Sequence, residues 1–180
     1  AAIYGAKGNS GIIFAQYIQG FSEVSTNLMT MDNFSLRLER GFNRAYQAIE
    51  DPKEGTMITL MRTFSNSVKK FISKSKNFIE LIKLSYKELK EELSDTPNKL
   101  HVLKENKVVD AGAKGFLLFV EGFIYALEGK TLVLETQTKE KIVDKKSHTH
   151  TSHFRYCVEA LLENKDSFLT FSSATFGCKD

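Results

Sequence analysis

The chain has 180 residues, of which 42% are hydrophobic, so it is long enough for one globular domain with a real core. Its 25 basic and 22 acidic residues give a net charge of +3, a mixed balance that argues against a nucleic-acid-binding surface. With only Cys157 and Cys178 as cysteines and no apolar run near the roughly 18 residues of a membrane span, the sequence excludes a disulfide-stapled fold, contains no predicted membrane span and predicts a cytoplasmic location.

The chain opens on a glycine-rich segment that leads directly into a helix-patterned stretch. Residues 5–11 read GAKGNSG, in which Asn9 and Ser10 are good N-cap residues. Apolar residues at helical spacing predict a helix from Ser10 to about Ser22. Glycines and the unpaired N–H groups of a first helical turn favour anion binding, so the segment predicts a phosphate-binding helix start. A tight turn before a helix is the alternative.

Three further amphipathic helices follow, because apolar residues recur at spacings of three and four. They are predicted over residues 34–49, 57–71 and 78–93. Asp51-Pro52 ends the first of them, since the residue before a proline disfavours helix. Gly55-Thr56 marks the restart before the second. Charged residues over 87–92 predict a solvated outer face on the third.

The last part of the helical region contains a short helix and the most apolar helix. Thr96-Pro97 predicts the start of the short helix, because proline suits the first helical position after a capping residue. A break over 108–112 follows, and an apolar pattern then predicts a helix from Phe116 to Leu127. Six helices joined by short breaks predict an all-α antiparallel bundle or barrel over residues 1–130.

The composition changes after Gly129. Residues 131–153 have no helical periodicity and predict a linker, and a strand is expected to begin near Phe154. Four potential zinc ligands lie close together there: His148, His150, His153 and Cys157. A polar linker that binds no metal is the favoured interpretation, so no metal ligand is assigned.

Three helix starts share one chemistry. Small or capping residues precede an apolar helix at Gly8–Gly11, at Glu54–Met57 and at Asp110–Ala113. The starts of alternate helices lie at the same end of an antiparallel bundle, so these segments predict a donor-rich rim suited to a polyphosphate. Ordinary loops between helices use the same residue types, which is the alternative.

In chain order, three segments resemble consecutive motifs of the DhaL-type kinase domain, the ATP-binding module of bacterial dihydroxyacetone kinases. The segments are GAKGNSG, AYQAIEDPKEGTMITLMRTF and TPNKLHVLKENKVVDAGAKGFLLFVEGF. They are most similar to the large subunit of bacterial fatty acid kinase, whose patterns resemble GARGNSG, EGT-hydrophobic-LT and VVDAGGQG. The resemblance covers about residues 4–128, and HFRYCVEALL is similar to the first strand of the domain that follows in those kinases. The resemblance therefore implies that residues 154–180 are the beginning of a second, α/β domain.

The resemblance implies a helical barrel with ATP or ADP and Mg²⁺ at one rim. By position it implies that Gly8, Asn9, Ser10 and Gly11 hold phosphates, that Thr56 and Met57 lie beside the nucleotide, and that Asp110, Ala111 and Gly112 form the remaining wall. Lys7 stands where the family usually has arginine, which keeps the charge but loses the bidentate fork. Ala113 and Lys114 replace the commoner Gly-Gln.

The metal motif of the resembled family is absent. In that family, aspartates of a DGDTGTN-like motif before the GNSG loop hold Mg²⁺, whereas no two aspartates here are separated by a single residue. Phosphoryl transfer depends on metal to neutralise charge between the phosphates. The chain is therefore expected to be N-terminally incomplete and inactive alone, and no catalytic residue is assigned in it.

Two functions follow from these observations. The first is the ATP-binding part of a kinase that transfers the γ-phosphate to a fatty acyl carboxylate or to dihydroxyacetone, held by a separate substrate-binding partner. The alternative is a truncated, non-catalytic remnant or a partner-binding fragment without kinase activity.

Overall fold

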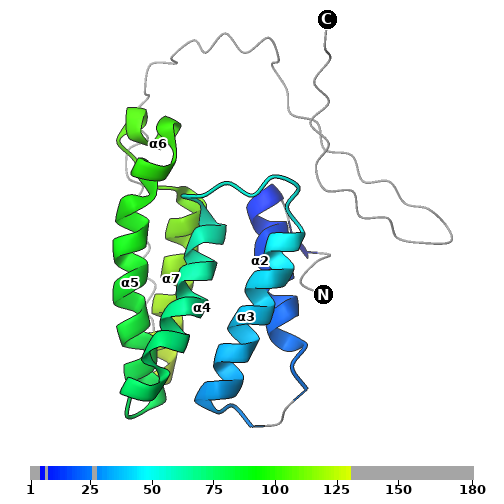
Figure 1. Ribbon diagram of the computed structural model, residues 1–180, viewed down its shortest axis with the longest axis vertical. Helices are drawn as coiled ribbons and strands as arrows, with labels where there is room; N and C mark the ends of the chain where they lie inside the picture. Colours follow the sequence, from blue (N-terminus) through cyan, green and yellow to red (C-terminus); the bar gives the residue numbers. More distant parts are fainter. Residues whose placement is uncertain (1–4, 7, 26–27, 131–180) are drawn as a thin grey trace, which may run out of the picture. The chain divides into compact units, whose positions relative to one another are not determined.

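A computed structural model of the chain describes residues 5–6, 8–25 and 28–130, and every regular element in these ranges is helical. The elements are α2 (Gly8–Ser22), α3 (Met31–Gln47), α4 (Met57–Phe71), the short 3-10 helix η1 (Ile72–Lys74), α5 (Phe78–Lys99), α6 (His101–Asn106) and α7 (Ala111–Leu127) (Figure 1). The predicted all-α class is confirmed. The predicted linker, second domain and histidine cluster lie outside the described residues, so the domain boundaries stay predictions.

The long helices run antiparallel in chain order (Figure 1). Helix α4 packs against α3, α5 and α7, and α2 packs mainly against α3. Aromatic pairs also join α2 to α7, because Tyr17 meets Phe116 edge to face at 5.4 Å and Phe14 meets Phe119 at 5.0 Å between ring centroids. This alternation brings the starts of α2, α4 and α7 to one end of the bundle.

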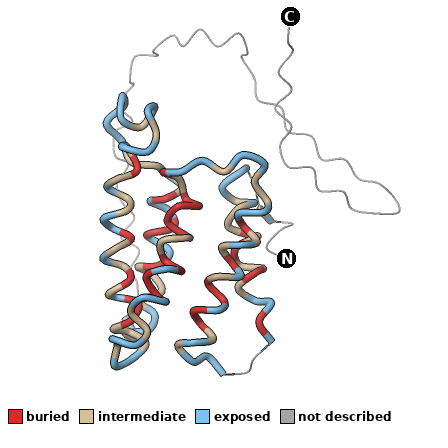
Figure 2. The backbone as a smooth tube through the Cα atoms, viewed as in Figure 1, coloured by how far each residue is buried: buried red, intermediate tan, exposed pale blue. Residues whose placement is uncertain are grey.

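A network of contacts between phenylalanine rings runs through the core. Figure 2 shows the buried positions of the helices facing one another across the bundle, and α4 contributes a nearly continuous buried face. Phe34 of α3 is 2% exposed and lies within 6.1 Å of four other rings, those of Phe21, Phe64, Phe78 and Phe123. Burying a side chain of this size stabilises the fold by about 1.5–3 kcal/mol, so one residue ties several helices together.

Two glycines allow α2 and α3 to approach closely. A Cβ atom on Gly20 would lie 2.6 Å from the Arg40 carbonyl oxygen and 2.9 Å from the Gly41 Cα. A Cβ atom on Gly41 would lie 2.9 Å from the Tyr17 carbonyl oxygen. The obstacles are backbone atoms, which cannot rotate away, so only glycine fits where these helices cross.

Helix α3 begins earlier than the apolar pattern predicts. The predicted start was near Phe34, but the helix begins at Met31 because Thr30 is its N-cap. The Thr30 side chain accepts a hydrogen bond of 3.1 Å from the Asn33 backbone N–H. Helix α3 ends at Gln47, before Asp51-Pro52, so the proline follows the helix and does not terminate it.

The prediction that Thr96-Pro97 starts a short helix is wrong. Helix α5 continues through Pro97 to Lys99, and the short helix α6 begins at His101. Pro97 has no N–H to donate to the Leu93 carbonyl one turn earlier. The Thr96 hydroxyl donates to that carbonyl instead, at 2.8 Å. The lost backbone bond is thus replaced by a side-chain bond, and the helix does not break.

We predict that Gly20→Ala destabilises the chain by about 1–3 kcal/mol, because the added methyl forces the α2 and α3 backbones apart. Gly115→Ala is the matched control, since an added Cβ there meets no atom within 4 Å. That change is expected to stabilise α7 by up to about 1 kcal/mol. Urea unfolding followed by circular dichroism measures both, and equal effects at the two positions would contradict the assigned crossing.

Candidate functional site

The first predicted site segment forms the opening turn of α2. Gly8 begins the helix with a φ of +69°, a conformation that favours glycine. Asn9 and Ser10 lie inside the first turn and are exposed, so they do not cap the helix from outside it as predicted. Gly11 is half-buried and faces Ala6. In this position Asn9 and Ser10 present their side chains beside the N-terminal donors of the helix.

The second segment leads into α4 through a left-handed glycine. Gly55 has a φ of +81° and is buried, and Thr56 is the N-cap residue of α4. The Thr56 hydroxyl donates to the Lys53 carbonyl at 2.8 Å and makes no capping bond to the helix. The first-turn N–H groups of α4, at Met57 and Ile58, therefore gain no acceptor from the Thr56 side chain.

The third segment begins α7 with a capped N-terminus. Asp110 is the N-cap residue, and its carboxylate Oδ2 accepts a hydrogen bond of 2.7 Å from the Ala113 backbone N–H. Ala111 and Gly112 lie in the first turn, Ala111 exposed and Gly112 half-buried. The carboxylate already complements the positive end of this helix dipole, so α7 offers less to an incoming anion than an uncapped helix does.

The three segments meet at Gly112. A Cβ atom placed on Gly112 would lie 3.2 Å from Asp110 Oδ2, 3.4 Å from Met57 Cβ and 3.5 Å from Ser10 Oγ. One point in space is therefore within contact distance of the starts of α2, α4 and α7. The structure brings together one or more residues from each predicted segment, at the end of the bundle where these helices begin (Figure 1).

A charged network supports the loop before α4, and sequence reasoning did not assign it. The Glu54 carboxylate accepts two hydrogen bonds from Arg62, at 2.6 and 2.5 Å, and one from the Thr59 hydroxyl at 2.9 Å. Thr59 is 1% exposed, and its hydroxyl also accepts the Gly55 backbone N–H at 2.9 Å. The network thus fixes the left-handed Gly55 from the side of α4. Part of the signal was present, since Thr59 and Arg62 are three residues apart on one side of α4, whereas Glu54 lies in the loop before the helix.

Hydrogen bonds from Arg62 hold the pKa of Glu54 below its ordinary value of 4.5; partial burial opposes this shift, and the Thr59 hydrogen bond adds to it. A carboxyl group with a lowered pKa in the folded state contributes stability above its unfolded pKa. That contribution is lost as the pH falls from about 4.5 through the lower folded value. Because both side chains are more than a third exposed, solvent screening keeps this contribution small.

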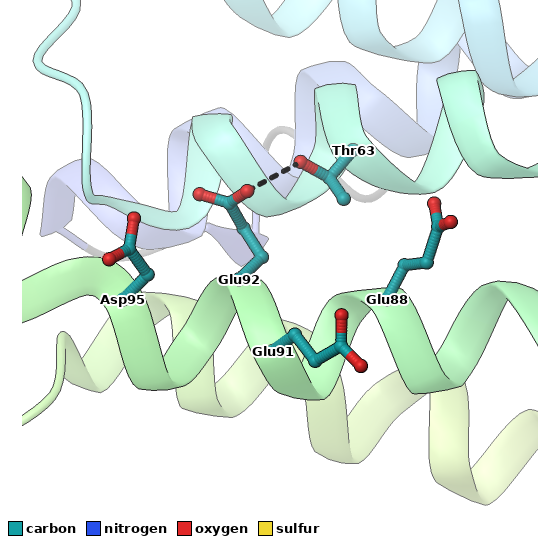
Figure 3. A pocket seen from close by; sticks show the side chains of 5 residues that line it. All are labelled: Thr63, Glu88, Glu91, Glu92 and Asp95. Atoms are coloured by element: carbon teal, nitrogen blue, oxygen red, sulfur yellow. Dashed lines mark hydrogen bonds between the residues drawn. The ribbon is translucent and has the colours of Figure 1, made fainter.

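A second polar region lies between α4 and α5 and has a different character. Figure 3 shows Thr63 of α4 facing Glu88, Glu91, Glu92 and Asp95 of α5, around a depression of about 310 Å³. Its lining contains no residue of the predicted nucleotide site, and its negative charge opposes phosphate binding.

Two of the charged α5 residues are not the solvated outer face that the sequence predicts. Glu88 is half-buried and accepts hydrogen bonds from Ser67 and Lys70, both of α4. Glu92 is also half-buried and accepts from Lys99 and from Thr63, the latter at 3.3 Å. The reason is that residues four apart share one side of α5, and this side faces the hydroxyl groups of α4.

Metal-binding clusters and membrane-spanning helices are both absent from the described ranges. Residues 5–6, 8–25 and 28–130 hold no group of three or more histidine, cysteine, aspartate or glutamate side chains that could bind a metal ion. None of the helices in these ranges combines the length and the apolar character needed to cross a bilayer.

Comparison with known proteins defines the class. The DAK2 domain family matches residues 1–125. An uncharacterized protein of Staphylococcus saprophyticus is 32% identical over 184 residues, which cover 97% of this chain and 33% of that protein. An uncharacterized protein of Staphylococcus aureus strain USA300 is 32% identical over 188 residues, which cover 92% of this chain and 33% of that protein. The chain thus spans about a third of the length of these curated relatives.

The helical fold, with alternate helices starting at one end, defines an all-α helical domain. The chain belongs to the DAK2 domain family, the DhaL-type domain of dihydroxyacetone kinases. The family is a family of phosphotransferases, and its domains in general bind ADP or ATP. Sequence similarity therefore agrees with the predicted family at the level of the domain.

We predict that Glu54→Gln removes part of the pH dependence of stability. Above about pH 5 the variant is less stable than the wild-type chain, and the difference shrinks as the pH falls below 4.5, because the wild-type carboxylate then becomes protonated. Thermal unfolding between pH 7 and pH 3 measures this. Glu91→Gln is the control, because Glu91 is exposed. A wild-type advantage that stays constant over the whole range would contradict the role of the Glu54–Arg62 pair.

Proposed function

We propose that this chain forms the ATP/ADP-binding part of a cytoplasmic kinase that phosphorylates an acyl carboxylate or dihydroxyacetone held by a separate substrate-binding partner. The observation that carries the proposal is the convergence of three helix starts around Gly112. Helix N-termini attract phosphate through free N–H groups and through the positive end of the helix dipole.

We propose a different role in nucleotide binding for each of the three rim segments. Gly8, Asn9, Ser10 and Gly11 are proposed to hold phosphates, Thr56 and Met57 to lie beside the nucleotide, and Asp110, Ala111 and Gly112 to form the remaining wall. The N-terminus of α4 gains no capping bond from Thr56, which supports its use by a ligand oxygen. The absence of a side chain at Gly112 supports a close approach, because a Cβ there would lie 3.2 Å from Asp110 Oδ2 and in ordinary contact with Met57 and Ser10.

Magnesium does not fit the described residues alone. Asp110 is the acidic residue of the three predicted segments that lies at the Gly112 contact, and its carboxylate is engaged with the Ala113 N–H. Mg²⁺ in kinases is usually held by one or two carboxylates together with phosphates, and a carboxylate that already caps a helix is a poor candidate for that role. We therefore propose that Mg²⁺ is held with the help of aspartates outside residues 5–130. When bound, the metal neutralises charge between the phosphates.

The acceptor is proposed to be a fatty acid in preference to dihydroxyacetone. VVDAGAKG at residues 108–115 and the YC pair at 156–157 are similar to the fatty acid kinase branch. The matched relatives are about three times as long as the aligned region, so each of them is long enough to contain further domains. A separate partner protein is proposed to present the carboxylate to the rim.

We predict that Ser10→Ala and Asn9→Ala each weaken ADP binding by about five- to a hundredfold, the equivalent of about 1–3 kcal/mol for a lost phosphate hydrogen bond. Lys114→Ala is the matched control and is expected to change affinity less than twofold, because Lys114 is exposed and departs from the family pattern. Nuclear magnetic resonance titration with ADP to millimolar concentration measures even weak binding. Shifts are expected at residues 8–11, 56–57 and 110–112.

The role of metal is tested in the same titration. Mg²⁺ is expected to tighten ADP binding strongly after fusion of an N-terminal segment with a DGDTGTN-like motif, and little in the chain alone. Absence of shifts at the rim in both proteins would refute the proposal and favour the non-catalytic alternative. Micromolar Mg-ADP binding by the unextended chain would show that the aspartate motif is not needed.

A further inference from the structure

The last turn of α5 lies between two of the three rim segments. Thr96 and Lys99 belong to this turn, while Gly55 precedes α4 and Asp110 precedes α7. Although α5 contributes no residue to the predicted nucleotide site, its end contacts both of these segments.

Thr96 makes the contact on the α7 side. Its side chain is fully buried, with 0% exposure. The hydroxyl donates to the Leu93 carbonyl at 2.8 Å and accepts the Asp110 backbone N–H at 3.2 Å. A single buried hydroxyl therefore joins the end of α5 to the residue that caps α7.

The same turn encloses Gly55 on the α4 side. A Cβ atom on Gly55 would lie 2.8 Å from Lys99 Cβ and 3.1 Å from the Thr96 carbonyl oxygen. Gly55 is held in its left-handed conformation between these atoms and the Thr59 hydroxyl on the other side. Movement of the α5 end would thus displace the loop before α4 and the start of α7 together.

We propose that Thr96 is a positioning residue for nucleotide binding. Its hydroxyl fixes Asp110, and its backbone turn fixes Gly55, so the starts of α7 and α4 are ordered before the ligand arrives. This inference rests on the proposed function, because it assumes that the rim binds a nucleotide. Order already present in the free protein lowers the entropy that binding must remove.

Two substitutions of Thr96 distinguish a role of its hydroxyl in positioning from a role of its methyl group in packing. Valine has the shape of threonine but cannot bond to Leu93 or Asp110, and Pro97 cannot supply the missing donor. Serine keeps the hydroxyl but loses the buried methyl group. Thr96→Val therefore removes the positioning bonds, whereas Thr96→Ser mainly removes packing.

Ser85 provides a matched control on the same helix. It is also 0% exposed, and its hydroxyl donates to the Leu81 carbonyl at 2.9 Å within α5. That bond lies far along the helix from the rim segments. Ser85→Ala thus removes a buried hydroxyl from α5 without touching Gly55 or Asp110.

The experiment measures ADP affinity and amide exchange in the full chain and its three variants, by magnetic resonance at a temperature where all are folded. Thr96→Val is expected to weaken ADP binding about tenfold and to speed exchange of the Asp110 N–H at least tenfold. Thr96→Ser and Ser85→Ala are expected to stay within about twofold of the wild-type chain in both measurements, even where they lower the unfolding temperature.

The outcomes separate this inference from the proposed function. If the wild-type chain binds ADP and Thr96→Val binds it equally well, the inference is overturned while the proposed function stands. If affinity falls in all three variants in proportion to their stability, Thr96 is a packing residue and the inference is again overturned. If ADP binds neither to the wild-type chain nor to the chain fused to the aspartate-containing segment, the proposed function fails and so does the binding role of Thr96. Unchanged Asp110 exchange in Thr96→Val would overturn the ordering step by itself.

Discussion

The close contact of three helix starts at Gly112 is the constraint on which the rest of the structure depends. Atoms of Ser10, Met57 and Asp110 lie within 3.5 Å of the point that a Gly112 side chain would occupy. Helices can converge in this way only if alternate helices run in the same direction, which the antiparallel order of the bundle provides. The helix–helix packing below the rim then follows from the phenylalanine core, centred on Phe34.

The electrostatics of the rim are not uniform, although the three sequence segments look alike. Asp110 caps α7 with its own carboxylate, so that helix end is already neutralised. Thr56 directs its hydroxyl back to Lys53 and makes no capping bond to α4. A phosphate at this rim would therefore be drawn to α2 and α4, with the start of α7 serving as a wall beside them. Gly112 matters most in this arrangement, because a side chain there would occupy space beside the starts of α2 and α4.

Much of the fold could be predicted from the sequence, because each helix has a strong apolar face. Helix α4 has the predicted bounds, Met57 to Phe71, since Gly55-Thr56 marks its start. The common end of the alternate helix starts also followed from chain order alone. The orientations of Glu88 and Glu92 could not be predicted, because charged side chains face solvent unless a neighbouring helix offers hydroxyl donors. The hydroxyl donors for these two glutamates lie on α4, so their orientation depends on how α4 packs against α5 and cannot be read from the α5 sequence alone.

Thr96-Pro97 shows why local sequence signals can mislead near the end of a helix. The pair has the pattern of a helix start, and yet α5 continues through it, because the threonine hydroxyl replaces the donor that proline lacks. The continuation places Thr96 and Lys99 in one helical turn that reaches Gly55 and Asp110. The Thr96 hydroxyl that compensates for proline inside α5 is therefore also the group that links α5 to the start of α7. The same side chain thus keeps the helix continuous and holds one segment of the proposed binding site in place.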